Sequence, residues 1–204
     1  MAGGEVYVAT AVETDGPVPG PHSLLSLASV AVTRDGTIRS RFTANLDELD
    51  GAAADPAVGA WWASQPAAWS ACRADAEPPG AAMRNYLAWL NALPGRPVFV
   101  GYPASAAYLW AAWYLHRFTG HNPFGRGALD LRTMAMTLRG WPYRESKMRH
   151  MPEHWLADVS LRSYVAADRA ENVARLLIHM LDDWRKLHPH PVGSGGGDGM
   201  RLLD

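Results

Sequence analysis

The 204-residue sequence has a single cysteine, no long apolar run and almost no net charge. One thiol, Cys72, cannot form an internal disulfide, which is typical of proteins kept in a reducing compartment. Every apolar run is shorter than the roughly 18 residues that a membrane-spanning helix needs. The N-terminus lacks the basic and apolar regions of a secretory signal. The sequence therefore predicts a cytoplasmic protein with no membrane partner.

The charges are balanced, with 19 basic and 20 acidic residues and a net charge of −1. This balance gives no general attraction for nucleic acid, so any binding to phosphates must come from a local basic patch. Hydrophobic residues make up 48% and charged residues 19%, which is the composition of a folded globular protein. The nine tryptophans are expected in the core or along a groove, because each has a large apolar area.

The first part of the chain predicts an antiparallel meander. Residues 5–13 and 24–33 are rich in β-branched and apolar side chains and are typical of strands. Residues 34–37, Arg-Asp-Gly-Thr, predict a hairpin turn, after which residues 38–44 return as a third strand. Residues 47–76 are rich in Ala and Trp, and they predict loops and short helices packed on the sheet.

The second part alternates helices with one short strand. Four segments carry apolar side chains at helical spacing: 80–93, 105–118, 129–138 and 167–187. Residues 97–101 predict a buried strand that lies parallel to its neighbour, because a helix crossover precedes it. Residues 139–162 look irregular. We therefore expect an α/β domain over residues 1–187, with a mixed sheet flanked by helices, and a flexible tail rich in Gly, Pro and His over residues 188–204.

The first strand delivers one carboxylate, Glu13, to its carboxyl end. In nucleases that work through two metal ions, such a strand usually ends Asp-x-Glu. Two carboxylates that are two residues apart then point to the same side and bind the metals. Here the first of those two positions is Ala11. This alanine raises the question of whether the protein is an enzyme.

Four segments of the chain resemble the DnaQ-like (DEDDh) 3′–5′ exonucleases, and the resemblance extends over about residues 5–187. The segments are Val12-Glu13-Thr14-Asp15-Gly16-Pro17, Gly101-Tyr102-Pro103-Ala104-Ser105, Trp113-Tyr114-Leu115-His116-Arg117-Phe118-Thr119-Gly120 and Asn122-Pro123-Phe124-Gly125. The resemblance implies a ribonuclease-H-like fold. It also implies four acidic side chains that hold two Mg²⁺ or Mn²⁺ ions, and a histidine, five residues before the last aspartate, that acts as general base.

The resemblance assigns these five catalytic positions to Ala11, Glu13, Ala107, Ser163 and Asp168. Glu13 and Asp168 keep their carboxylates and are the predicted catalytic and metal-binding residues. Alanines replace two expected aspartates, and Ser163 replaces the histidine. Two carboxylates imply at most one weakly held ion, since Mg²⁺ prefers six oxygen ligands. A serine hydroxyl cannot replace an imidazole as a base near neutral pH.

Three other residues were candidates to restore the site. Asp15 lies just beyond the first strand. Asp130 lies near a helix start. The ordinary interpretation of this residue is an N-terminal acid that is favoured by the helix dipole. His150 could swing in from the irregular segment as a base. His150 and His154 also have a zinc-like spacing, but Pro152 lies between them and a third ligand is not evident.

Residues 139–155 interleave basic and aromatic side chains. Such a segment suits a single strand of nucleic acid, because the cations contact phosphates and the rings stack on bases. The candidate nucleic-acid-binding residues are Trp141, Tyr143, Arg144, Lys147, Arg149 and His150. The alternative is a solvated loop whose aromatic side chains pack on the core, with Glu145 and Glu153 diluting the charge.

Two classes of function follow from this sequence. The first is an exonuclease-like protein that binds single-stranded DNA or RNA 3′ ends with little or no hydrolysis, or that acts as a protein-interaction scaffold. The second is an active or residually active metal-dependent exonuclease with a reorganised metal site. Engineered Asp→Ala changes at positions 11 and 107 are a variant of the second class, and Ser163 argues against it. A homodimer or a protein partner is open in both classes.

Overall fold

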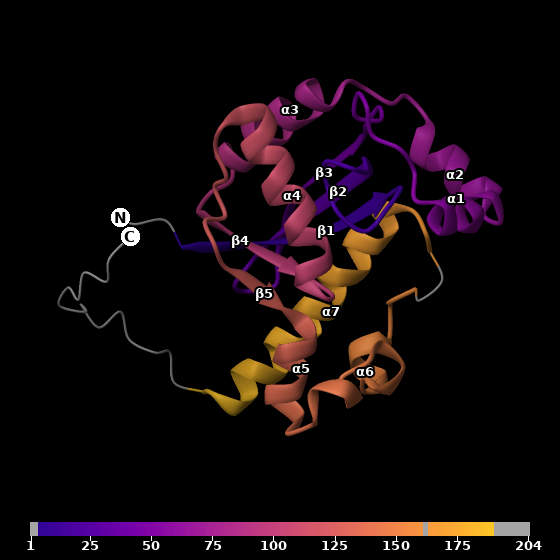
Figure 1. Cartoon of the computed structure of the whole chain (residues 1–204). Coiled ribbons are helices and arrows are strands. Elements are labelled where there is room, and N and C mark those ends of the chain that lie inside the picture. The colour runs from indigo at the N-terminus through magenta and orange to yellow at the C-terminus, as the bar shows by residue number, and fades with distance from the viewer. Residues whose placement is uncertain (1–3, 161–162, 190–204) are drawn as a thin grey trace.

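The protein forms a five-stranded mixed sheet with helices on both faces (Figure 1). The computed structural model describes residues 4–160 and 163–189. In the order β3-β2-β1-β4-β5, the sheet contains the following strands: β1 (Glu5–Thr14), β2 (Leu24–Thr33), β3 (Ile38–Asn45), β4 (Arg96–Gly101) and β5 (Ala128–Asp130). β1 is therefore the central strand, and its carboxyl end lies in the middle of the sheet edge.

The first three strands form the predicted antiparallel meander. β1 pairs with β2 from Val6 opposite Thr33 to Glu13 opposite Ser26, and the register shifts just after Glu13. β4 runs parallel to β1 on its other side, as predicted for a strand that follows a helix crossover. The meander and the parallel strand are both confirmed.

The predicted helix over residues 129–138 was wrong at its start. Residues 128–130 form β5, which pairs parallel with β4, and α5 (Leu131–Arg139) follows directly. The carboxylate of Asp130 accepts a hydrogen bond of 2.8 Å from the backbone N–H of Thr133. This N-cap sets the start of the helix at Leu131. A segment of only three residues cannot be assigned to helix or strand by its periodicity.

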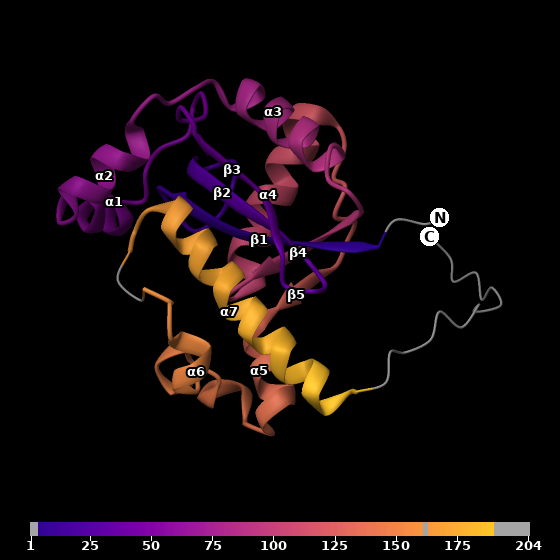
Figure 2. The same ribbon diagram turned by 180° about the vertical axis from the view of Figure 1, so that it is seen from behind.

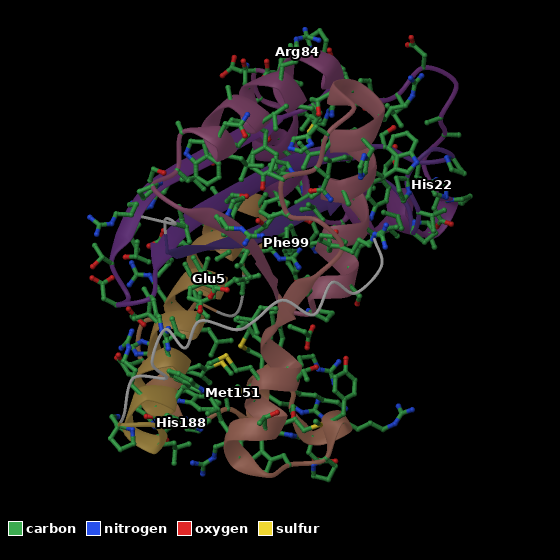
Figure 3. The ribbon with its side chains drawn as sticks, turned by 90° about the vertical axis from the view of Figure 1, so that its left-hand side faces the viewer. Glu5, His22, Arg84, Phe99, Met151 and His188 are labelled. Atoms are coloured by element: carbon green, nitrogen blue, oxygen red, sulfur yellow. The ribbon has the colours of Figure 1, made fainter. Side chains whose placement is uncertain are left out.

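One face of the sheet is covered by α7 (Ala166–Leu187), which crosses behind the strands in Figure 1 and in front of them in Figure 2. Its apolar stripe includes the buried residues Val173, Leu177 and Met180. The opposite face is covered by α3 (Pro79–Asn91) and α4 (Ala104–Thr119). Figure 3 shows Phe99 of β4 within this second layer. Each face therefore has its own apolar core.

Two short helices lie near the carboxyl ends of the central strands, as predicted for the Ala-rich region. These are α1 (Pro56–Ala63) and α2 (Pro66–Arg73). Their buried residues Trp62 and Cys72 pack with Leu25 of β2. The indole N–H of Trp62 donates to the carbonyl of Thr14 at 3.0 Å. This bond fixes α1 against the end of β1.

Residues 139–162 are mostly irregular, as predicted, but they contain three short helices. These are two 3₁₀ turns, η1 (Tyr143–Glu145) and η2 (Met148–His150), and α6 (Glu153–Leu156). Trp155 is fully buried against α7, and its indole donates to Asp183 at 2.8 Å. Met151 is also buried, and it lies between α5 and α7 in Figure 3. The segment is therefore anchored to the fold at several points.

The remaining predictions of organisation concern domain bounds and membranes. The predicted tail over residues 188–204 falls, from residue 190 onward, outside the described residues. The assignment of residues 1–187 to one domain stays a prediction. None of the helices in the described ranges combines the length and the apolar character that crossing a bilayer requires.

Candidate functional site

A pocket opens at the carboxyl end of β1, between the starts of α4 and α7 and the irregular segment. Figure 2 shows the start of α7 beside the end of β1. The lining residues include Ala11 from β1, Ala107 from α4, Arg149 from the irregular segment, and Ser163 and Arg169 at the start of α7. Segments that are far apart in sequence therefore meet at one position, which the sheet topology alone brings together.

The five positions assigned by resemblance come together around this pocket. Ala11 and Ala107 are each 6% exposed and line it, as does Ser163. The hydroxyl of Ser163 donates to the carboxylate of Asp168 at 2.7 Å. Glu13 lies two residues beyond Ala11 and lines an adjoining pocket. The spacing of these residues in the sequence therefore corresponds to a common location in the fold.

The carboxylate of Glu13 forms an ion pair with Arg169, a residue that the sequence did not single out. The Arg169 guanidinium donates to Oε1 of Glu13 at 2.7 Å. The Glu13 side chain is only 6% exposed, whereas that of Arg169 is 43% exposed. Burial raises the pKa of Glu13 above its ordinary value, and the Arg169 charge opposes this rise. The only sequence signal for Arg169 was its place next to Asp168.

The residues present do not fit a two-metal centre. Mg²⁺ and Mn²⁺ sites need several oxygen ligands that converge on the ion. Here the Glu13 carboxylate is bound by Arg169, and the Asp168 carboxylate accepts from Ser163. Within residues 4–160 and 163–189, no three His, Cys, Asp or Glu side chains come together in a way that could hold an ion. The donor set is therefore smaller than the chemistry of such a centre requires.

Two of the candidate replacement acids are committed to other bonds. Asp15 is buried, and its carboxylate accepts from the backbone N–H of Ser23. Asp130 caps α5 and also accepts from the backbone N–H of Ala104 at 2.7 Å, which joins the starts of α4 and α5. The ordinary interpretation of Asp130 as a helix-start acid is therefore confirmed. Both carboxylates therefore accept hydrogen bonds from backbone N–H groups.

The two histidines of the irregular segment have separate partners. A ring nitrogen of His150 lies 2.9 Å from the carbonyl of Glu145, and the other accepts from Arg149 at 3.1 Å. The ring of His154 lies 2.8 Å from Asp183 on α7. The two rings therefore do not share a ligand set, and His150 is held on its own segment.

Buried Ser146 holds the irregular segment against the pocket. Its carbonyl accepts from the hydroxyl of Tyr102 at 3.2 Å and from Nε of Arg132 at 3.2 Å. Tyr102 follows β4 and Arg132 lies on α5, so the segment is fixed to two elements of the fold. This attachment places Met148 and Arg149 in the pocket wall.

The predicted nucleic-acid-binding residues have different environments. Arg149 lines the pocket. Four others are exposed on the same segment: Tyr143, Arg144, Lys147 and His150. Trp141 is half-buried, packs against the core and lies beneath the guanidinium of Arg139, with 5.5 Å between them. The core-packing alternative therefore holds for Trp155, and in part for Trp141.

The adjoining pocket, which Glu13 and Arg169 also line, has several apolar side chains in its wall. Trp61 is 36% exposed, Leu109 is 44% exposed, and both contribute to its wall. The ring of Tyr164 meets that of Trp61 edge to face, with centroids 5.1 Å apart. The tryptophans were expected in the core or along a groove. Trp62 is buried in the core, and Trp61 lies in the pocket wall. Leu109 and Tyr164 were missed because exposure cannot be read from sequence.

The first prediction concerns the Glu13–Arg169 pair. Arg169→Ala leaves a buried carboxylate without its cation, so the pKa of Glu13 rises further. A raised pKa in the folded state gives stability that is present below the ordinary glutamate pKa and is lost as the pH rises through the raised value. We expect the variant to lose about 1–3 kcal/mol more at pH 8 than at pH 5. Urea unfolding followed by tryptophan fluorescence measures this difference.

The matched control is the double variant Glu13→Gln/Arg169→Ala. It lacks the titrating carboxylate and should not show the added pH dependence. A loss of stability in Arg169→Ala that is the same at both pH values would contradict the assignment of the effect to Glu13.

A curated relative indicates the family. Over 133 residues the chain is 30% identical to the 3′–5′ DNA exonuclease Cap18 of Escherichia coli, and the match covers 64% of this chain and 67% of that protein. No family model matches the chain.

Solved structures agree with this relationship at the level of the fold. The nuclease domain of 3′hExo, a DEDDh family member bound to rAMP, has a TM-score of 0.65 and 13% identity, with 88% of this chain and 92% of that chain covered. E. coli exonuclease I in complex with a dA16 oligonucleotide has a TM-score of 0.62 and 14% identity, with 91% of this chain and 44% of that chain covered. The predicted ribonuclease-H-like fold is thereby confirmed. The chain belongs to the DnaQ-like (DEDDh) 3′–5′ exonuclease superfamily.

Proposed function

We propose that this protein is a catalytically impaired exonuclease homologue that binds single-stranded 3′ ends of DNA or RNA. The observation that carries the proposal is the ion pair between Glu13 and Arg169. The retained glutamate of the first motif is bound to a side-chain cation, and the two partner positions are alanines. The fold is that of the exonuclease family, whereas the ligand set for the metals is incomplete.

The choice of ligand is supported by the related proteins. One relative is named as a 3′–5′ DNA exonuclease, and structural neighbours are complexes with a dA16 oligonucleotide and with a histone mRNA stem-loop recognised at its 3′ end. The cleft of this chain offers Arg149 and Arg169 to phosphates. The exposed Arg144 and Lys147 extend the positive charge along the same segment. In this proposal DNA and RNA are both candidate ligands.

The proposed loss of hydrolysis follows from the chemistry of the five positions. Two-metal hydrolysis needs ions that generate the attacking hydroxide and stabilise the leaving oxygen. The Ser163 hydroxyl donates a hydrogen bond to the Asp168 carboxylate, so it acts as a partner of the carboxylate and not as a base. Mg²⁺ or Mn²⁺, the expected cofactors of the family, therefore have no adequate ligand set here.

Residual hydrolysis with a reorganised metal site is the second candidate function. It is favoured by the retention of Glu13 and Asp168, whose carboxylates could hold one ion weakly if Arg169 moved away. The proposal also includes a cytoplasmic location and either a homodimer or a complex with a protein partner. The single buried cysteine, Cys72, is compatible with that location because the fold needs no disulfide.

We predict that the purified protein does not shorten a 5′-labelled single strand from its 3′ end in the presence of Mg²⁺ or Mn²⁺. The reason is the incomplete ligand set around Glu13 and Asp168. The measurement is a denaturing gel of the labelled strand over time. Trimming that requires metal and disappears in Glu13→Ala would overturn the proposal in favour of the second candidate.

A second prediction is that the lost site can be rebuilt. The variant Ala11→Asp/Ala107→Asp/Ser163→His restores the expected residues, and Arg169→Ala removes the cation that competes for Glu13. We expect the fourfold variant to bind Mn²⁺ in calorimetry and to trim a strand. The threefold variant, which keeps Arg169, should bind Mn²⁺ more weakly. A fourfold variant with a native circular dichroism spectrum and no Mn²⁺ binding would show that the positional assignment is wrong.

A third prediction concerns the basic segment. Replacing Arg144, Lys147 and Arg149 with glutamine should weaken single-strand binding roughly tenfold at low salt. The slope of log affinity against log salt should fall by the amount expected for the loss of about two to three phosphate contacts. Fluorescence anisotropy over a salt series measures both effects. The matched control replaces three exposed arginines elsewhere, Arg84, Arg96 and Arg117. Equal losses in both triple variants would remove the segment from the binding surface.

A further inference from the structure

The Glu13–Arg169 pair places a cation at the wall of a pocket. The carboxylate is almost fully buried, whereas the guanidinium is nearly half exposed. Arg169 lines both the main pocket and the adjoining apolar one, so its head group lies at their junction. A guanidinium has several N–H donors in a planar fork. The bond to Glu13 uses one nitrogen and fixes the direction of the group.

The charges around the main pocket are the reverse of those in a metal centre. Its charged lining residues, within the described ranges, are Arg149 and Arg169, and none of its lining residues is an acid. The remaining polar lining residues are neutral: Thr10, Tyr102, Ser160, Ser163 and Asn172. The two cationic side chains of this lining attract an anion.

The retained acids are both bonded to neighbouring side chains. Glu13 is paired with the Arg169 cation, and the carboxylate of Asp168 accepts a hydrogen bond from the neutral hydroxyl of Ser163. Ser163 also accepts from the backbone N–H of Val165 at 3.1 Å, which fixes its hydroxyl toward Asp168. Both carboxylates are thereby engaged within the protein, and the positive charge of Arg149 remains uncompensated by any carboxylate of the described residues within 4 Å.

The neutral wall of the pocket is held in place by a two-point contact. The backbone N–H of Ser160 donates to Asn172 at 2.9 Å, and the Asn172 amide donates back to the Ser160 carbonyl at 2.6 Å. This contact joins the irregular segment to α7. The part of the pocket wall formed by Ser160 and Asn172 is therefore held by two hydrogen bonds.

The adjoining pocket offers an apolar surface beside the guanidinium. Trp61 and Leu109 line it and are partly exposed. An aromatic ring of this kind stacks on the flat face of a nucleobase. A ligand with an anion and a flat ring, separated by a few bonds, matches the two pockets and the cation between them.

We propose that Arg169 takes the place of the family's metal ions and binds a nucleotide phosphate directly, with Arg149 as a second cation. Glu13 is a positioning residue for Arg169. Guanidinium groups bind phosphate through paired hydrogen bonds, so binding needs no divalent ion. The ligand is a phosphate ester of a nucleotide, present either as the 3′ end of a strand or as a mononucleotide. The inference rests on the proposed function and specifies how the phosphate is held.

The test compares binding with and without metal in the full chain. A fluorescein-labelled dA12 strand is titrated in EDTA and in Mg²⁺, with anisotropy as the readout. We expect the two dissociation constants to agree within about twofold at matched ionic strength. Arg169→Gln should weaken binding at least about tenfold, the loss typical of a charge-assisted contact. Binding that disappears in EDTA would overturn the inference.

Glu13→Gln separates the two models by the sign of its effect. If Glu13 is a metal ligand, this change weakens binding. If Arg169 binds the phosphate, the change removes a nearby acid, keeps an oxygen that accepts from the guanidinium, and leaves the affinity equal or higher. A loss of affinity in Glu13→Gln with a native circular dichroism spectrum would contradict the inference.

The matched control is Arg175→Gln. Arg175 lies on the same helix and pairs with Asp158, so the variant loses the same charge outside the pocket, and its affinity should stay near that of the unmodified protein. If Arg169→Gln does not fold, Arg149→Gln together with Glu13→Gln tests the same site. The inference would be overturned if Arg149→Gln kept its affinity for the labelled strand and Glu13→Gln lost it.

Competition distinguishes the two sources of phosphate. If AMP displaces the labelled strand at concentrations similar to those at which unlabelled dA12 does, the pocket is a mononucleotide site. If only dA12 displaces the labelled strand, the pocket binds a strand end. Strand binding that persists in EDTA but is independent of Arg169 would refute the inference and leave the proposed function intact. If the strand does not bind, the proposed function fails. Calorimetry with AMP in EDTA, in the unmodified protein and in Arg169→Gln, then decides on the pocket alone.

Discussion

The site depends on how one buried carboxylate is neutralised. Glu13 ends the central strand and has almost no exposed surface, and an ionised carboxylate at such a position is costly without a partner. A metal ion is one solution and a side-chain cation is another. Arg169 provides the second solution from the first turns of α7. The pair also joins the helix to the end of β1, so the electrostatic partner of Glu13 is part of the packing of α7 on the sheet.

The other substitutions are consistent with this single pair. One guanidinium carries one charge and can compensate one carboxylate. Aspartates at positions 11 and 107 would add charges around the same pocket, and without metal ions they would repel Glu13. Alanines at both positions avoid this repulsion and are small enough to remain buried. Ser163 gives Asp168 a neutral partner. The bonds of Ser163 and Arg169 also argue against two engineered Asp→Ala changes, because such changes would not supply these partners.

Much of the fold could be predicted from the sequence, and the exceptions have physical reasons. The long elements were predictable because ten or more residues with one periodicity distinguish a helix from a strand. β5 was not, since its three residues, the last of which is the Asp130 cap, carry too little pattern. The assignment of Ala11, Ala107 and Ser163 to the catalytic positions came from the resemblance to the exonuclease family. Arg169 did not, because its partner Glu13 is 156 residues away in the chain. Trp141 and Trp155 occur in the same segment, and sequence alone could not show that only Trp155 is fully buried.

The exchange of a metal for a guanidinium separates binding from chemistry. A divalent ion holds phosphate and also lowers the pKa of a bound water, which generates the nucleophile. A guanidinium offers hydrogen bonds and charge, but it cannot coordinate or ionise a water in this way. Ser163 does not supply the missing base because its proton is directed to Asp168. In the proposed site, a phosphate held by Arg169 would receive the electrostatic part of the exonuclease mechanism without an attacking group, and the site would retain its ligand instead of consuming it.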